Sequence, residues 1–341
     1  MDNKKINKEV RKISSFSSLP LLCFVLAYIL MTLGFNALMV YLNNNSVSVD
    51  TGLMTLIAYI ILYLLVIPTS MLLFYRTRGR KTGQTLKSCF TKPKKSAGWI
   101  AKWLLIAIGV IYLSGFLSNL LFTIIEGLTG VSLTAKEIAF DNSIFGVINT
   151  LVALPIFAPI LEELLFRGTL FRNTQPLGEW FAVIITSLMF GLWHMNYTQL
   201  LFASVMGVFS CLLLIKTRSI IPSMLLHFII NSIGAVQSLC MMNLDVNMVS
   251  SGDINYIISH ITPIMIIGLI GFMIIGLIIA GLVLLVIELI RHRGRANLAK
   301  CEYQIKPLKK LSVYFSAPIT IIVFAILISV TVLNALNILH L

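Results

Sequence analysis

Three charged side chains stand inside one apolar segment of the sequence. The segment runs from about Ile144 to Phe171 and contains Glu162, Glu163 and Arg167. A charge at the centre of a bilayer costs about 2.5–3.5 kcal/mol on insertion scales, so three together require a reason. Glu163 and Arg167 have i,i+4 spacing, which places them on one helical face where they can pair. The Glu162 carboxylate is then left over in a medium of low dielectric constant, which makes it a candidate general base.

Two further apolar segments also contain polar side chains, and in each of them the notable residues form a pair spaced by one helical turn. One contains Phe190 and His194, and a later one contains His227 and Asn231. Counted at 1.5 Å per residue from the nearest cytoplasmic boundary, Glu162 lies ~15 Å deep, His194 ~22 Å, His227 ~14 Å and Asn231 ~20 Å. These depths are compatible with one cavity between the cytoplasmic half and the middle of the membrane.

The motifs Glu-Glu-x-x-x-Arg, Phe-x-x-x-His and His-x-x-x-Asn, in this order on membrane helices, resemble the signature of the CPBP family. This family contains CAAX prenyl endopeptidases and bacteriocin-processing or immunity membrane proteins. The resemblance covers roughly residues 144–235, and every signature position is filled. It implies an intramembrane endopeptidase that cuts a membrane-associated peptide or protein.

The resemblance implies a role for four of these residues. Glu162 would act as the general base for a water, and His194 would hold and polarise that water. His227 and Asn231 would donate hydrogen bonds to the oxyanion of the tetrahedral intermediate. Fixed donors of this kind are worth about 3–4 kcal/mol each, and a neutral histidine and an amide can both donate.

The same resemblance implies that Glu163 and Arg167 form a structural pair and that Phe190 supports the site. Pro155 and Pro159 lie one turn apart just before the glutamates and predict a kink. That kink either has no further role or opens a water-lined pocket beside the carboxylates. The alternative for the glutamates is an interfacial position, which requires the helix to end near residue 161.

A metal mechanism is the alternative to direct activation of water by a glutamate. Glu162, His194 and His227 would be the ligands, because one glutamate with two histidines resembles a His₂Glu zinc site. The sequence has no His-Glu-x-x-His motif, and these ligands would come from three different helices. We therefore favour a mechanism without a metal or other cofactor, with a divalent ion such as zinc as the alternative.

These residues must be positioned by membrane-spanning helices. Nine apolar segments each approach the ~20 residues that cross the hydrocarbon of a bilayer. They are residues 18–42, 53–75, 99–125, 144–172, 179–195, 199–215, 219–241, 262–290 and 313–339. The predicted fold is an all-α polytopic bundle with three regions: 1–143 with three spans, 144–241 with four catalytic spans, and 242–341 with two.

Basic residues predict the orientation of these spans. They gather before the first span and in the loops 76–95 and 291–310, whereas the loops 43–52 and 242–261 contain no Lys or Arg. The positive-inside rule then places the N-terminus in the cytoplasm and the C-terminus outside, with Lys136 as the exception among the loop residues. The basic loop 76–95 is also expected to meet anionic lipid headgroups.

Composition narrows the function classes. The chain is 58% hydrophobic and only 11% charged, so its net charge of +13 indicates membrane topology rather than nucleic-acid binding.

The five scattered cysteines lack the spacing of a zinc cluster or disulfide framework. The first apolar segment is too long for a cleaved signal peptide and predicts a retained anchor. The Lys-, Asn- and Ile-rich composition suggests a bacterial plasma membrane.

Two other functions fit an intramembrane polar cluster. A bacteriocin-immunity or partner-binding protein would hold a peptide without cutting it. A secondary transporter would also place ionisable groups at the middle of the membrane, but the sequence shows no internal symmetry that supports one. The expected partners are a membrane-associated peptide or protein and the lipid bilayer, and the sequence makes no prediction of oligomeric state.

Overall fold

The structure is a computed structural model that describes residues 2–48, 50–131, 133, 143–242, 244–292, 297–336 and 338. These residues form helices joined by loops and contain no strand, which confirms the predicted all-α fold. The predicted exception to the charge rule, Lys136, lies outside the described residues.

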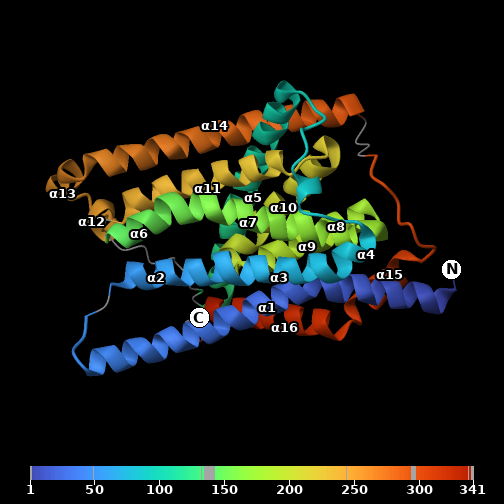
Figure 1. The fold of residues 1–341 in the computed structure, drawn as a ribbon. Coiled ribbons are helices and arrows are strands. Elements are labelled where there is room, and N and C mark those ends of the chain that lie inside the picture. The colour runs from blue at the N-terminus through green and yellow to red at the C-terminus, as the bar shows by residue number, and fades with distance from the viewer. Residues whose placement is uncertain are drawn as a thin grey trace.

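The helical elements follow one another along the chain (Figure 1). Their bounds are α1 (Asn3–Asn44), α2 (Thr51–Tyr59), η1 (Ile60–Val66), α3 (Ile67–Phe74), η2 (Tyr75–Gly79), α4 (Arg80–Thr82), η3 (Lys87–Cys89), α5 (Ala97–Thr129), α6 (Ile144–Ile148), η4 (Asn149–Phe157), α7 (Ala158–Glu163), η5 (Leu164–Phe171), α8 (Arg172–Thr174), η6 (Gln175–Leu177), α9 (Glu179–Trp193), α10 (Tyr197–Thr217), α11 (Ile221–Met241), α12 (Val246–Ser250), α13 (Ile254–Ser259), α14 (Ile261–His292), α15 (Pro307–Phe315) and α16 (Pro318–Ala335).

Within the described part of the chain, eight helical segments are long and apolar enough to cross a membrane, which confirms a multi-pass membrane protein. The predicted fifth span is the shorter helix α9, whose 15 residues extend about 22 Å. That length is less than the ~30 Å of bilayer hydrocarbon. The predicted last span is divided, because α15 ends at Phe315 and α16 begins at Pro318.

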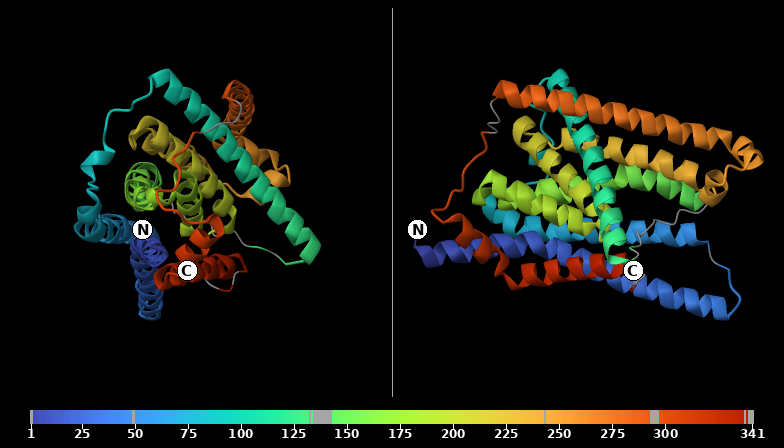
Figure 2. Two further views of the ribbon diagram at one scale, coloured as in Figure 1. Left: turned by 90° about the vertical axis from the view of Figure 1, so that its right-hand side faces the viewer. Right: turned by 180° about the vertical axis from the view of Figure 1, so that it is seen from behind.

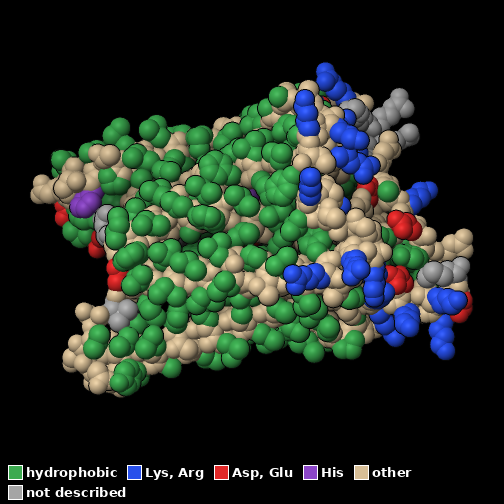
Figure 3. Space-filling model, viewed as in Figure 1, with side chains coloured by type: hydrophobic (Ala, Val, Ile, Leu, Met, Phe, Trp, Pro, Cys, Tyr) green, Lys and Arg blue, Asp and Glu red, His purple; other side chains and the backbone are tan. Residues whose placement is uncertain are grey.

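Lys and Arg side chains gather at one end of the bundle, and apolar side chains cover most of the remaining surface (Figure 3). This distribution is the one that alternating crossings predict. The side of the membrane that the basic end faces stays a prediction.

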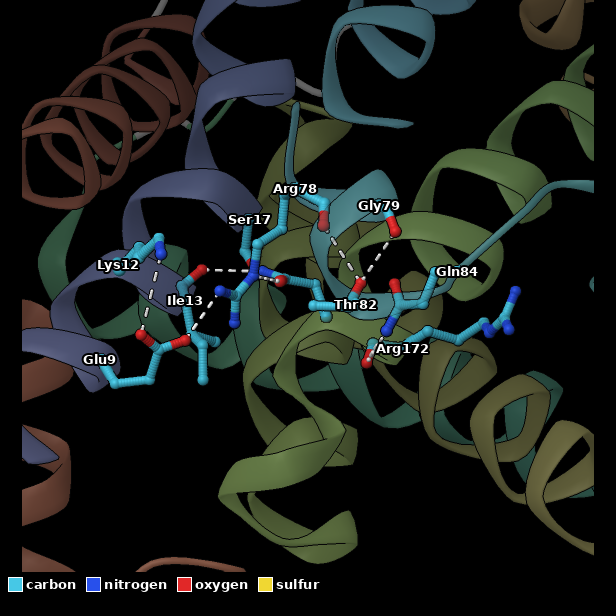
Figure 4. Close-up of polar contacts among 10 residues, drawn as sticks. Glu9, Lys12, Ile13, Ser17, Arg78, Gly79, Thr82, Gln84 and Arg172 are labelled. Carbon is cyan, nitrogen blue, oxygen red and sulfur yellow. Dashed lines mark hydrogen bonds and ion pairs between the residues drawn. The ribbon is translucent and has the colours of Figure 1, made fainter. Parts of the chain in front are cut away.

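A buried arginine joins three helical elements at the basic end (Figure 4). Arg78 Nη1 in η2 lies 2.7 Å from Glu9 Oε1 in α1, and Arg78 Nε donates to Asn173 Oδ1 in α8 at 3.1 Å. Asn173 Nδ2 in turn donates to the Ile13 carbonyl and to Ser17 Oγ, both at 2.8 Å. This network fixes the first, second and fourth spans relative to one another.

Two helices that carry no site residue also approach closely. The helix α5 crosses the other helices steeply (Figure 2). It meets α14 at Gly109 and Gly281, where a Cβ added to Gly281 would lie 3.0 Å from the Gly109 Cα. Small residues permit this contact between membrane helices.

The helix that carries His194 is held against α10 by another close approach. A Cβ added to Gly191 would lie 2.1 Å from Ser204 Oγ and 2.4 Å from the Leu200 carbonyl oxygen. From the other side, a Cβ added to Gly207 would lie 2.9 Å from the Ser187 Cα. The position of the C-terminal end of α9 therefore depends on glycine at 191.

We expect Gly191→Ala to lower the melting temperature in detergent, because α9 and α10 must separate to accommodate the methyl group. Overpacking of this kind costs about 1–3 kcal/mol. Gly234→Ala in α11 is the matched control, since an added Cβ there has no described atom within 4 Å. The control should be neutral or slightly stabilising, because alanine favours a helix by roughly 0.5–1 kcal/mol. Equal melting temperatures for the two variants would contradict the close approach.

Candidate active site

The two adjacent glutamates lie in α7, a short α-helical piece between the π-helical segments η4 and η5. Pro155 lies inside η4 and Pro159 is the second residue of α7, and a proline lacks the N–H that continues an α-helical ladder. At the end of η4 the Ala158 N–H donates to the Ala153 carbonyl, five residues back. The next carbonyl, that of Leu154, would need an N–H from Pro159, which has none.

Asn231 of α11 supplies the missing donor. Its Nδ2 donates to the Leu154 carbonyl at 2.9 Å. The predicted oxyanion donor therefore also satisfies the backbone of the helix that carries Glu162. An asparagine amide has two donor hydrogens, so one remains for a substrate, and the oxyanion role stays a prediction.

Glu163 and Arg167 form a buried ion pair. Glu163 Oε1 lies 3.0 Å from Arg167 Nη1, and their side chains are 0% and 1% exposed. The Arg167 guanidinium also lies 4.4 Å from the centre of the Phe190 ring, a cation–π arrangement. The interfacial alternative for the glutamates is inconsistent with this complete burial.

His227 lies between the two glutamates. Its Nδ1 is 3.2 Å from Glu163 Oε1, and its Nε2 is 3.9 Å from Glu162 Oε2. A carboxylate oxygen only accepts, so Nδ1 carries the proton and Nε2 of the neutral ring is an acceptor. In this tautomer His227 receives a hydrogen bond at the Glu162 side, and it donates to an oxyanion only as an imidazolium.

His194 directly follows α9, which ends at Trp193, and caps the helix. Its Nδ1 donates to the Phe190 carbonyl at 2.9 Å, so its Nε2 is also an acceptor in the neutral ring. The Phe190 ring lies between both histidines, with ring centres 5.0 Å from His194 and 5.7 Å from His227. His194 interacts electrostatically with Glu162 and His227.

Glu162 has one occupied and one open carboxylate oxygen. Tyr63 Oη in η1 donates to Oε1 at 2.6 Å. Oε2 is buried and has no hydrogen-bond partner among the described residues. Sequence reasoning did not identify Tyr63. The available signal was a pair of tyrosines, Tyr59 and Tyr63, on one face of the second apolar segment.

The mechanism without a metal stays a prediction. Among the residues that the structure describes, no three His, Cys, Asp or Glu side chains are grouped so as to hold an ion. Glu162, His194 and His227 are therefore treated below through their own acid–base chemistry.

Two buried carboxylates, the buried His227 and the half-buried His194 inside a bundle of membrane-crossing helices define a multi-pass membrane protein with an intramembrane polar site. Residues 143–233 match the family model of the type II CAAX prenyl endopeptidase Rce1-like proteins. This match confirms the resemblance that the three motifs indicate, over nearly the segment predicted.

One relative is a protein of Escherichia coli that carries the description "Uncharacterized 24.3 kDa protein". The two chains are 32% identical over 142 residues, which cover 39% of this chain and 61% of the relative. This chain thus spans less than two thirds of that protein. No solved structure matches this chain.

Proposed function

We propose that the chain is an intramembrane CAAX-type endopeptidase that cuts a membrane-associated peptide or protein with water activated by Glu162. The observation that carries this proposal is the open, buried Oε2 of Glu162, which faces His227 inside the segment that matches the family. A buried carboxylate oxygen without a partner is costly unless another group uses it.

In the proposed reaction a water enters between these two side chains. The 3.9 Å from Glu162 Oε2 to His227 Nε2 is too long for a hydrogen bond, and both atoms are acceptors when His227 is neutral. A water donates two hydrogen bonds, one to each atom, which leaves its lone pairs directed elsewhere. Such a water is oriented to attack a peptide carbonyl carbon.

The reaction then follows by general acid–base catalysis. Glu162 Oε2 takes a proton as the water oxygen forms its bond to the carbonyl carbon, and the carbonyl oxygen becomes an oxyanion. The second amide hydrogen of Asn231 donates to that oxyanion. Glu162 returns the proton to the leaving nitrogen as the carbon–nitrogen bond breaks, so both products form without a metal. His194 Nε2 accepts a hydrogen bond from the substrate, since both hydrogens of the water are already donated.

The deciding experiment compares native membranes that contain the wild type or Glu162→Gln. Mass spectrometry of peptide and protein termini, with and without a chelator, gives the readout. We expect a terminus that only the wild type produces and that persists in the chelator. Identical profiles for the two proteins, with the cellular phenotype retained in the variant, would replace the peptidase by a binding role. Loss of the terminus in chelator would overturn the metal-independent mechanism.

A further inference from the structure

We propose that Tyr63 is a positioning residue that determines which oxygen of Glu162 acts as the base. The inference rests on the proposed peptidase function. Tyr63 occupies Oε1, so only Oε2 remains to bind and deprotonate a water beside His227. Without this bond, the carboxylate plane would be free to turn to angles at which neither oxygen is directed at the water.

The bond itself has the geometry of a strong interaction. A hydroxyl that donates to a carboxylate at 2.6 Å is a charge-assisted hydrogen bond, shorter and stronger than one between neutral groups. Glu162 is only 4% exposed, so solvent competes little for the same oxygen. Low local polarity strengthens the bond further.

Aromatic contacts hold Tyr63 in place. Its ring meets the edge of Phe24 from α1, with centres 6.4 Å apart and planes at 83°. The Phe24 ring also stacks on Trp193, the residue before His194. The first span thereby links the tyrosine that holds Glu162 to the end of the helix that presents His194.

Tyr63 lies outside the segment that matches the family. The second span therefore completes a site whose other polar groups all come from residues 143–233. The buried network around Arg78 fixes that span against the fourth, which carries Glu162. The N-terminal region thus contributes to catalysis indirectly, because this single hydroxyl positions Glu162.

Tyr63→Phe removes the hydroxyl and keeps the ring. Tyr59→Phe is the matched control, because Tyr59 lies one turn away, contacts the Tyr63 ring at 5.5 Å and has the same hydroxyl. Infrared spectra of the purified proteins identify the Glu162 carboxylate as the band that Glu162→Gln removes. We expect Tyr63→Phe to shift this band and Tyr59→Phe to leave it unchanged.

Kinetics on the substrate found by terminal profiling give the second readout. We expect kcat of Tyr63→Phe to fall about 10- to 100-fold, part of what a general base contributes, with KM within about 2-fold of the wild type. Tyr59→Phe should keep wild-type values. An unshifted band, or an unchanged kcat, would overturn the positioning role. If Tyr63→Phe shifts the band but the wild type cleaves no substrate, the peptidase function would be overturned, while the hydrogen bond from Tyr63 to Glu162 would stand.

Discussion

Glu163→Ala should remove most of the folded protein. The change leaves the Arg167 guanidinium, which is 1% exposed, without its partner at 3.0 Å. His227 also loses the carboxylate that accepts from its Nδ1. Breaking a buried ion pair in this way costs about 3–5 kcal/mol. Since whole proteins are stable by only about 5–15 kcal/mol, we expect a clear fall in melting temperature and in the monodisperse yield from detergent.

A double replacement tests the reason for that loss. Glu163→Leu combined with Arg167→Met removes both charges and keeps apolar volume, which is often neutral or stabilising for a buried pair. We expect it to recover the melting temperature. It should stay inactive, because His227 still lacks the Glu163 acceptor that selects its tautomer. If Glu163→Ala were as stable as the wild type, the claim that the variant leaves Arg167 buried without a compensating charge would be wrong.

Glu162→Gln should lower kcat by about 10²–10⁴-fold, the contribution of a positioned general base. A glutamine amide accepts a hydrogen bond from Tyr63 but cannot take a proton from water. We expect stability close to that of the wild type, because the change removes a charge from a site that is 4% exposed. The measurement is steady-state kinetics with the substrate identified by terminal profiling, alongside thermal unfolding of the same preparations.

A buried carboxylate elsewhere in the bundle provides the control for this variant. Glu288 of α14 pairs with Lys102 of α5 at 2.5 Å, outside the candidate site. Glu288→Gln should weaken that pair and leave kcat of the folded protein unchanged. If Glu162→Gln retained a kcat within tenfold of the wild type, Glu162 would not be the base.

The sequence by itself determined the features that depend on one segment at a time. Apolar runs of sufficient length located the spans, because backbone groups in lipid must be satisfied within a helix. The i,i+4 spacings predicted that Glu163 and Arg167 share a helical face, and they form the buried pair. They also placed His227 and Asn231 on one face of α11, and both contact the helix that carries Glu162. The three motifs together were sufficient to indicate the family.

Only the tertiary structure decided which groups on different helices meet. Helical spacing carries no information on how two helices are tilted, shifted or separated, so the tyrosine pair in the second segment did not indicate that Tyr63 donates to Glu162. The same reason applies to Asn231, whose contact depends on a π-helical turn that places the Leu154 carbonyl opposite a proline. It applies as well to the His227 tautomer, since the Glu163 carboxylate that accepts from its Nδ1 lies on another helix.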